Sequence, residues 1–198
     1  MKKKSIITIV LLICCLLLGC TGLLVFHLRG SVKILATNNY MVNEHVVLYR
    51  QDSSEWANDY LGTSTYTMKS SGCLVTCIAV AISNDGRNIT PGELNQLFSK
   101  ENMYDTEGNL QWERLKNLEN FSVQVYNGVS AEDISSCLEE GHFPIVRVRM
   151  KGWGSFHYVL IVGSENGDYI CVDPLEDELT TLSDYNNRIY AIRCVWEE

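Results

Sequence analysis

The chain has 198 residues, 46% of them hydrophobic, which is enough to fill the core of one domain of common size. Residues 45–198 contain 11 Lys and Arg against 23 Asp and Glu, a net charge of −12. Such an acidic domain disfavours binding to nucleic acid and other anionic polymers, and it mildly favours basic or neutral substrates.

The first 26 residues include the longest apolar run of the chain. Lys2, Lys3 and Lys4 precede an uncharged run over residues 6–26, which as a helix is roughly 30 Å long, the thickness of a bilayer core. The pattern predicts a transmembrane signal anchor over residues 1–26 that contacts the membrane through residues 6–26. The three lysines outnumber the bases on the other flank, so the domain is expected outside the cytoplasm.

Two other interpretations of this segment stay open. One is a cleaved secretory signal, and the other is a lipoprotein signal in which residues 17–19 lead to a lipidated Cys20. All three interpretations put the domain outside the cytoplasm. The anchor is preferred because the apolar run continues beyond Cys20 to Phe26, whereas a lipidated N-terminus normally opens into polar sequence.

Residues 27–44 show no sustained hydrophobic period and are predicted to form a stalk, so that the folded domain spans residues 45–198. Residues 51–72, rich in Ser, Thr, Asn and Gly, are expected to form an ordered loop. Four helices are expected after it, starting near Cys73, Thr90, Leu110 and Ser130. The second carries a capping box and a proline at its first position.

The last third of the chain changes to short β-branched and aromatic runs separated by Gly, Asn and Asp. These runs cover residues 145–148, 158–162, 169–172 and 189–195, and they predict the strands of an antiparallel sheet. Helices followed by a sheet, without regular alternation of strand and helix, indicate an α+β fold.

The predicted domain holds an odd number of cysteines: Cys73, Cys77, Cys137, Cys171 and Cys194. At least one thiol therefore stays unpaired within the chain, and the pairing of the others is left open. Their spacing matches neither a dense disulfide framework nor paired C-x-x-C zinc knuckles.

Cys73 stands at the predicted start of a helix, where the partial positive charge and the free N–H groups stabilise a thiolate. This position favours a nucleophile, although a small thiol that only packs in the core is the common alternative. Cys77 follows one turn later. A redox or zinc role for the pair is a weaker hypothesis, because a single C-x-x-x-C has no second pair of ligands.

A cysteine nucleophile needs a base within hydrogen-bonding distance, and the chain has four histidines. His27 falls in the predicted stalk, His45 falls at the start of the domain, and His142 follows Gly141 at a helix end, where a capping role is expected. His157 opens a predicted strand after a Gly-rich segment, which is a frequent position for a catalytic side chain. His157 is therefore the candidate base.

Asp173 stands at the end of the returning strand, before Pro174, and is the candidate acid that orients His157. A strict two-residue Asn-Gly turn puts the two side chains on opposite faces, whereas an odd loop or a bulge puts them on one face. We expect an odd loop centred on Glu165, with His157 directly opposite Asp173 and their polar atoms roughly 2.6–3.2 Å apart.

Five short elements follow one another in an order that is typical of one family. They are residues 51–56; Gly72, Cys73 and Thr76; Thr90, Pro91, Glu93 and Leu94; residues 157–159 with Gly163; and Val172, Asp173 and Pro174. In these elements the sequence resembles the bacteriocin-processing-peptidase-like cysteine peptidases, a papain-like group, over about residues 47–195.

The resemblance implies a papain-like fold with four catalytic side chains: the nucleophile Cys73, the base His157, the orienting acid Asp173 and the oxyanion donor Gln51. A Gln amide beside a backbone N–H gives a developing oxyanion two donors, worth about 3 kcal/mol each. The sequence departs from many relatives at Leu74, where they have Gly, and at Cys77, where they have Ser.

These observations predict a membrane-anchored, extracytoplasmic cysteine peptidase that acts on a peptide or protein substrate without a metal or cofactor. The best-known relatives remove double-glycine leaders from within ABC exporters, on the cytoplasmic side, so that substrate is not expected here. Two alternatives stay open. One is an amidase or acyltransferase of the same fold acting on cell-wall peptides, and the other is a non-catalytic binding module, for which Leu74 is the only hint.

Overall fold

The computed structural model describes residues 2–152 and 154–198, so Met1 and Trp153 lie outside the described residues. Within this part of the chain, six α-helices and a six-stranded antiparallel sheet form a mixed α+β architecture. The predicted α+β class is confirmed. The chain divides into two compact units, residues 1–31 and residues 32–198.

The first unit contains one helix, α1 (Lys2–Leu28), which is followed by Gly30 with a positive φ of 78°. No helix in the described part of the chain is both long enough and apolar enough to cross a membrane. The predicted transmembrane helix over residues 1–26 is therefore not supported by the structure.

The second unit begins earlier than the predicted boundary at residue 45. Strand β1 (Val32–Lys33) pairs with β7 (Arg188–Ile189), and Ile34 is buried in the core. Further on, the backbone of Tyr40 exchanges two hydrogen bonds with the backbone of Ser164. Part of the predicted stalk over residues 27–44 is thus packed on the domain.

Four helices form the helical part of the second unit: α2 (Met68–Ser71), α3 (Cys73–Asn84), α4 (Pro91–Lys100) and α5 (Trp112–Leu115). Every residue of α3 from Val75 to Ser83 is buried, which makes α3 the central helix of the core. The predicted capping box of α4 is confirmed, since the Thr90 and Glu93 side chains each accept a hydrogen bond from the other residue's backbone N–H. The helix expected over residues 110–118 is only the short α5.

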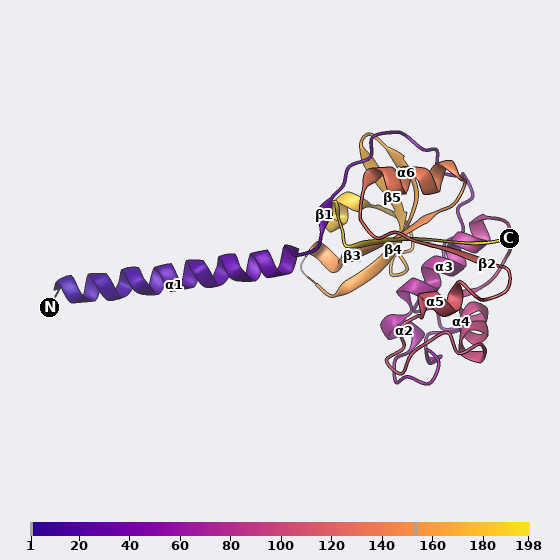
Figure 1. Ribbon diagram of the computed structural model, residues 1–198, viewed down its shortest axis with the longest axis horizontal. Coiled ribbons are helices and arrows are strands. Elements are labelled where there is room, and N and C mark those ends of the chain that lie inside the picture. Colours follow the sequence, from indigo (N-terminus) through magenta and orange to yellow (C-terminus); the bar gives the residue numbers. More distant parts are fainter. Residues whose placement is uncertain (1, 153) are drawn as a thin grey trace. The chain divides into compact units, whose positions relative to one another are not determined.

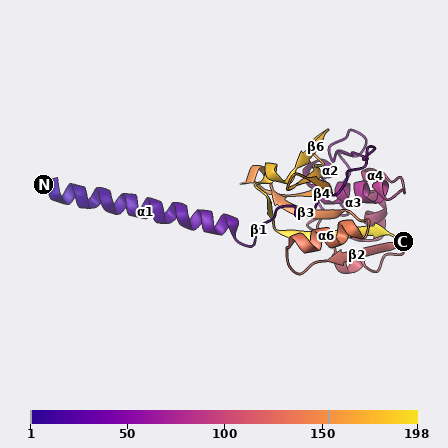
Figure 2. The same cartoon turned by 90° about the horizontal axis from the view of Figure 1, so that it is seen from above.

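The sheet has the strand order β2–β8–β3–β4–β5–β6. Its strands are β2 (Phe121–Val125), β3 (Pro144–Arg149), β4 (Phe156–Glu165), β5 (Asp168–Val172), β6 (Leu179–Thr181) and β8 (Ala191–Glu197). In Figures 1 and 2, α3 and its neighbouring helices lie on one side of the sheet and α6 (Ala131–Glu139) lies on the other. Strand β2 was not predicted, although its apolar residues Phe121, Val123 and Val125 alternate as in a strand.

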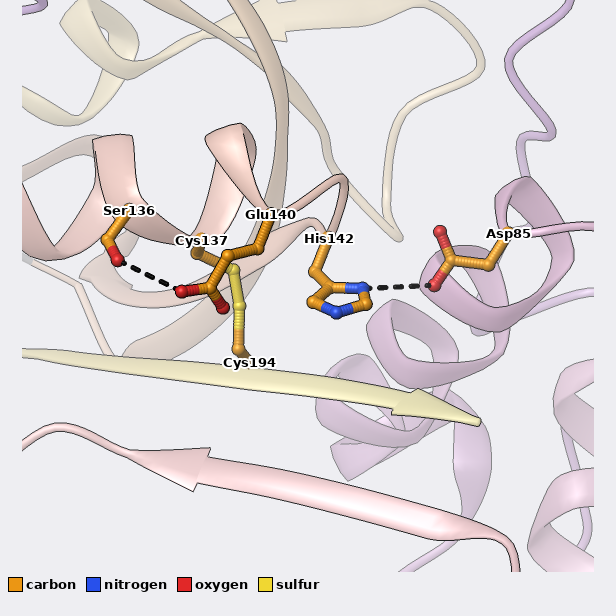
Figure 3. Close-up of a disulfide and its surroundings, with 6 residues drawn as sticks. All are labelled: Asp85, Ser136, Cys137, Glu140, His142 and Cys194. Carbon is orange, nitrogen blue, oxygen red and sulfur yellow. Dashed lines mark hydrogen bonds and ion pairs between the residues drawn. A yellow bond between two sulfur atoms is a disulfide. The ribbon is translucent and has the colours of Figure 1, made fainter. Parts of the chain in front are cut away.

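A disulfide joins Cys137 of α6 to Cys194 of β8, with the two Cα atoms 6.6 Å apart (Figure 3). Gly141 ends α6 with a positive φ of 85°, and the backbone N–H of His142 donates to the Cys137 carbonyl. This is the helix-capping arrangement predicted for His142. The disulfide fixes α6 to the sheet on the face opposite α3, and it leaves Cys73, Cys77 and Cys171 as the free thiols of the second unit.

Candidate active site

Cys73 is the first residue of α3 and is partly exposed. The first N–H groups of a helix have no acceptor within the helix, so they and the helix dipole favour a thiolate at this position. Gly72 precedes it, and a Cβ atom at Gly72 would lie 2.5 Å from the Met68 carbonyl oxygen. Glycine is therefore required for the tight passage from α2 into α3 that presents Cys73.

His157 and Asp173 form a buried pair, since their side chains are only 5% and 3% exposed. Nε2 of His157 lies 2.6 Å from Oδ1 of Asp173, within the distance range expected from the sequence. The same carboxylate oxygen accepts from the backbone N–H of Leu175 at 2.8 Å. With Nε2 held by the carboxylate, Nδ1 is the imidazole nitrogen that can face the thiol.

The predicted register of this pair is wrong in detail. The turn between β4 and β5 is the strict two-residue Asn166–Gly167 turn, with φ values of 54° and 84°, and not an odd loop. A bulge between Ile161 and Gly163 shifts the register and restores the shared face. Extending the pairing of Leu160 with Val172 by one residue puts Asp173 opposite Val159, so His157 and Asp173 are diagonal neighbours.

The Cys73 side chain lies close enough to the His157 imidazole to affect its pKa. Burial by itself lowers the pKa of His157, but the hydrogen bond to Asp173, the interaction with Cys73 and the nearby negative charges outweigh it and raise the pKa to about 9. Such an imidazole is cationic at neutral pH. A cationic partner and a helix N-terminus together stabilise the thiolate form of a cysteine.

Tyr185 also contacts this pair, and its role was not predicted from the sequence. Its hydroxyl donates to Oδ2 of Asp173, and its side chain is buried. Burial disfavours a charged Asp173, but the hydrogen bonds from His157, Tyr185 and Leu175 lower the pKa of the carboxylate overall. Tyr185 ends the short helix η2 (Leu182–Tyr185), and no sequence motif sets it apart from the other tyrosines.

Gln51 lies 4% exposed between two segments of the site. Its backbone N–H donates to the Pro174 carbonyl at 2.9 Å, directly after Asp173. Its side-chain Nε2 donates to the carbonyl of Lys69 at 2.8 Å, in the turn that leads into Cys73. One amide hydrogen stays available, so the location of Gln51 is compatible with an oxyanion donor.

A cavity of about 420 Å³ opens beside Cys73. Its walls include apolar and aromatic side chains from the helical part, among them Leu74, Leu110 and Trp112, together with Tyr158 from β4. Leu74, one of the two positions at which the sequence departs from many peptidases that it resembles, is therefore part of the cavity wall. The cavity is large enough to take a substrate side chain next to the thiol.

Cys77 and His142 do not take part in the candidate active site. Cys77 is fully buried, its thiol faces the Tyr158 carbonyl at 3.4 Å, and burial raises its pKa well above the ordinary value, so it packs as a neutral thiol. The His142 ring stacks on Trp196, with 4.3 Å between ring centroids, and lies 4.0 Å from Asp85 (Figure 3). His142 therefore belongs to the disulfide region.

The raised pKa of His157 leads to a prediction about stability. The pKa of His157 is higher in the folded protein, about 9, than the ordinary value of 6.5 expected in the unfolded chain. Protonation of His157 therefore stabilises the fold fully below pH 6.5, and this contribution is lost as the pH rises through about 9. We expect the free energy of unfolding to fall by about 3 kcal/mol across this window. Urea unfolding at pH 6 and at pH 9.5 measures the change. The same fall in His157→Gln protein would contradict the assignment.

No model of a known protein family matches the chain, and no curated protein matches it.

Proposed function

We propose that the protein is a papain-like cysteine peptidase with Cys73 as nucleophile and His157 as base. The proposal rests on the way Cys73, His157 and Asp173 lie together. Cys73 stands at a helix N-terminus and interacts with His157, and the imidazole lies 2.6 Å from the buried carboxylate of Asp173. The resemblance of residues 47–195 to the bacteriocin-processing-peptidase-like cysteine peptidases supports the same roles.

The geometry suits an acyl-transfer reaction. The Cys73 thiolate attacks the peptide carbonyl carbon, and the oxyanion accepts hydrogen bonds from the Cys73 backbone N–H and the Gln51 amide. The imidazolium of His157 gives its proton to the leaving amine as the C–N bond breaks, which leaves a thioester on Cys73. His157 then removes a proton from water, hydroxide attacks the thioester, and the acid product leaves as the thiolate is restored.

An amidase or acyltransferase of the same fold would use the same residues, with an amide of a cell-wall peptide as substrate. The domain charge of −12 argues against close contact with anionic wall polymers. Peptidase activity is therefore the preferred function. A non-catalytic binding module stays open as the alternative, and the reactivity of the Cys73 thiol distinguishes the two.

Selective alkylation tests the proposal before any substrate is known. We expect low concentrations of iodoacetamide at pH 6 to label Cys73 at least tenfold faster than Cys77 or Cys171, because Cys73 is partly exposed at a helix start while the other two are buried. Peptide mass mapping after short labelling times measures the three rates. The His157→Gln variant serves as control and is expected to lose the enhancement. A Cys73 that reacts no faster than a thiol in an unfolded peptide would refute the proposal.

We further propose that the domain lies outside the cytoplasm, with residues 1–26 as its anchor. The Cys137–Cys194 disulfide supports this location, since such bonds persist in oxidising compartments. Intact-mass analysis of membrane fractions, with free thiols blocked before lysis, is expected to find residues 1–26 retained and one disulfide formed. A chain that starts at a lipidated Cys20, a soluble form that starts near residue 30, or reduced Cys137 and Cys194 would contradict the corresponding part.

A further inference from the structure

Two arginines, Arg147 of β3 and Arg193 of β8, lie side by side on the face of the sheet that carries Tyr158. Arg147 is paired with Tyr158 across β3 and β4, and Arg193 is paired with Ile145, two residues before Arg147 on the same strand. Both side chains are partly exposed. We refer to Arg147 and Arg193 together as the arginine pair.

The arginine pair has no carboxylate partner within residues 2–152 and 154–198, although acids outnumber bases two to one in this domain. By contrast, Arg50 is bound by Asp52 and Asp177. The guanidinium of Arg147 lies over the Phe156 ring at 3.6 Å. Nε of Arg193 is buried without an acceptor, and Nη1 donates only to the neighbouring carbonyl of Ile192.

The arginine pair lies behind two residues that line the cavity beside Cys73, Tyr158 and Trp112. Tyr158 lines that cavity, and the charges of both arginines act on the pKa of its phenol. Trp112 lines it too, and the Arg193 guanidinium lies 5.4 Å from the Trp112 ring centroid. Each arginine thus neighbours an aromatic side chain of the cavity wall.

The two like charges are unfavourable for one another. Burial lowers the pKa of Arg193, and the nearby Arg147 lowers it further. A bound anion would remove this repulsion, and a guanidinium matches the two oxygens of a carboxylate with two parallel N–H donors. The only acid among the residues that line the cavity is Glu107, and its side chain is exposed to solvent.

We propose that Arg147 and Arg193 bind a carboxylate of the peptide substrate, so that the enzyme selects peptides with Asp or Glu close to the scissile bond. This inference rests on the proposed function for its biological meaning, but the binding itself is independent of catalysis. The proposed preference for acidic peptides differs from the expectation based on the net charge, which favours basic or neutral substrates. The reason is that two nearby positive charges affect a bound carboxylate more than the net charge of the whole domain does.

Binding of peptides to the full-length Cys73→Ala protein tests the proposed carboxylate site, because this variant binds peptides without cleaving them. The probes are blocked, fluorescent hexapeptides that differ only in Glu or Gln at one position, scanned along the peptide, and fluorescence anisotropy gives each Kd. We expect one position at which Glu binds at least tenfold more tightly than Gln, with a preference that shrinks in added salt. The preference should disappear in Arg147→Gln/Arg193→Gln protein, which loses two positive charges, and persist in Lys100→Gln protein, which loses one at the exposed end of α4.

Equal binding of Glu and Gln peptides at every position would overturn the proposal, and so would a preference that survives in the double variant. A parallel series with a free C-terminus separates two sources of the carboxylate. If only a free terminal carboxylate gives the preference, the site selects a chain end instead of an acidic side chain. If the preference is found but the unmodified protein cleaves none of the preferred peptides, the carboxylate site stands and the peptidase assignment fails. Far-ultraviolet circular dichroism at 25 °C checks that each variant is folded.

Discussion

Cys73→Ala protein is expected to lose peptide hydrolysis by a factor on the order of 10⁴–10⁶ while it stays folded. The loss follows because the bond-forming atom is removed and no other free thiol of the described domain is partly exposed at a helix start. Folding is retained because alanine is the best helix former and the replaced side chain is only partly buried. The kcat/KM ratio on a fluorogenic peptide and the urea midpoint measure the two effects.

Cys77→Ala is the matched control, since it removes a thiol from the same helix one turn later. That side chain is fully buried, so its loss leaves a small cavity and lowers stability. The activity of each folded molecule should be unchanged. Full activity in Cys73→Ser or Cys73→Ala protein would contradict the mechanism. Activity that survives alkylation but disappears with EDTA would indicate metal chemistry instead.

The sequence predicts where Cys73 and His157 stand in their helix and strand better than it predicts the strand register that brings His157 to Asp173. Cys73 at a helix start and His157 at a strand start follow from capping and from hydrophobic period, and both positions agree with α3 and β4. The distance between His157 and Asp173 was predicted, but the odd loop that was expected to produce it was wrong. The bulge after Ile161 has no signal in the sequence, because the run over residues 158–162 is apolar on both faces.

Tyr185 and the Cys137–Cys194 disulfide show a second limit of prediction. Each depends on contacts between segments that are distant in the sequence, and local periodicity carries no information on such contacts. The short α5 is a different case. The apolar period over residues 110–118 is real, but the residues after Leu115 turn back toward β2, and packing overrides the local preference.

Asp173 is expected to contribute to the site in two ways: it orients the His157 ring, and it places a negative charge beside that ring. Two variants at this position distinguish them. Asp173→Ala removes both, and we expect kcat/KM to fall by a factor on the order of 10²–10⁴. It also leaves the buried Tyr185 hydroxyl without its acceptor, so stability should fall. Asp173→Asn keeps an oxygen that accepts the Nε2–H of His157 but removes the charge, and its loss of activity should be smaller.

The pH profile of Asp173→Asn gives the sharper test. In the proposed mechanism the active pair is a thiolate with an imidazolium, so we expect activity to be lost on the alkaline side as His157 gives up its proton, near pH 9 in the unmodified protein. Without the carboxylate charge the pKa of His157 falls, and the alkaline limb of kcat/KM should move to lower pH by one unit or more. Tyr185→Phe keeps the negative charge of Asp173 and removes only the hydrogen bond from the Tyr185 hydroxyl. The carboxylate then interacts with His157 at least as strongly as before, so the alkaline limb should not move to lower pH. An alkaline limb that stays near pH 9 in Asp173→Asn protein would show that Asp173 does not set the charge state of His157.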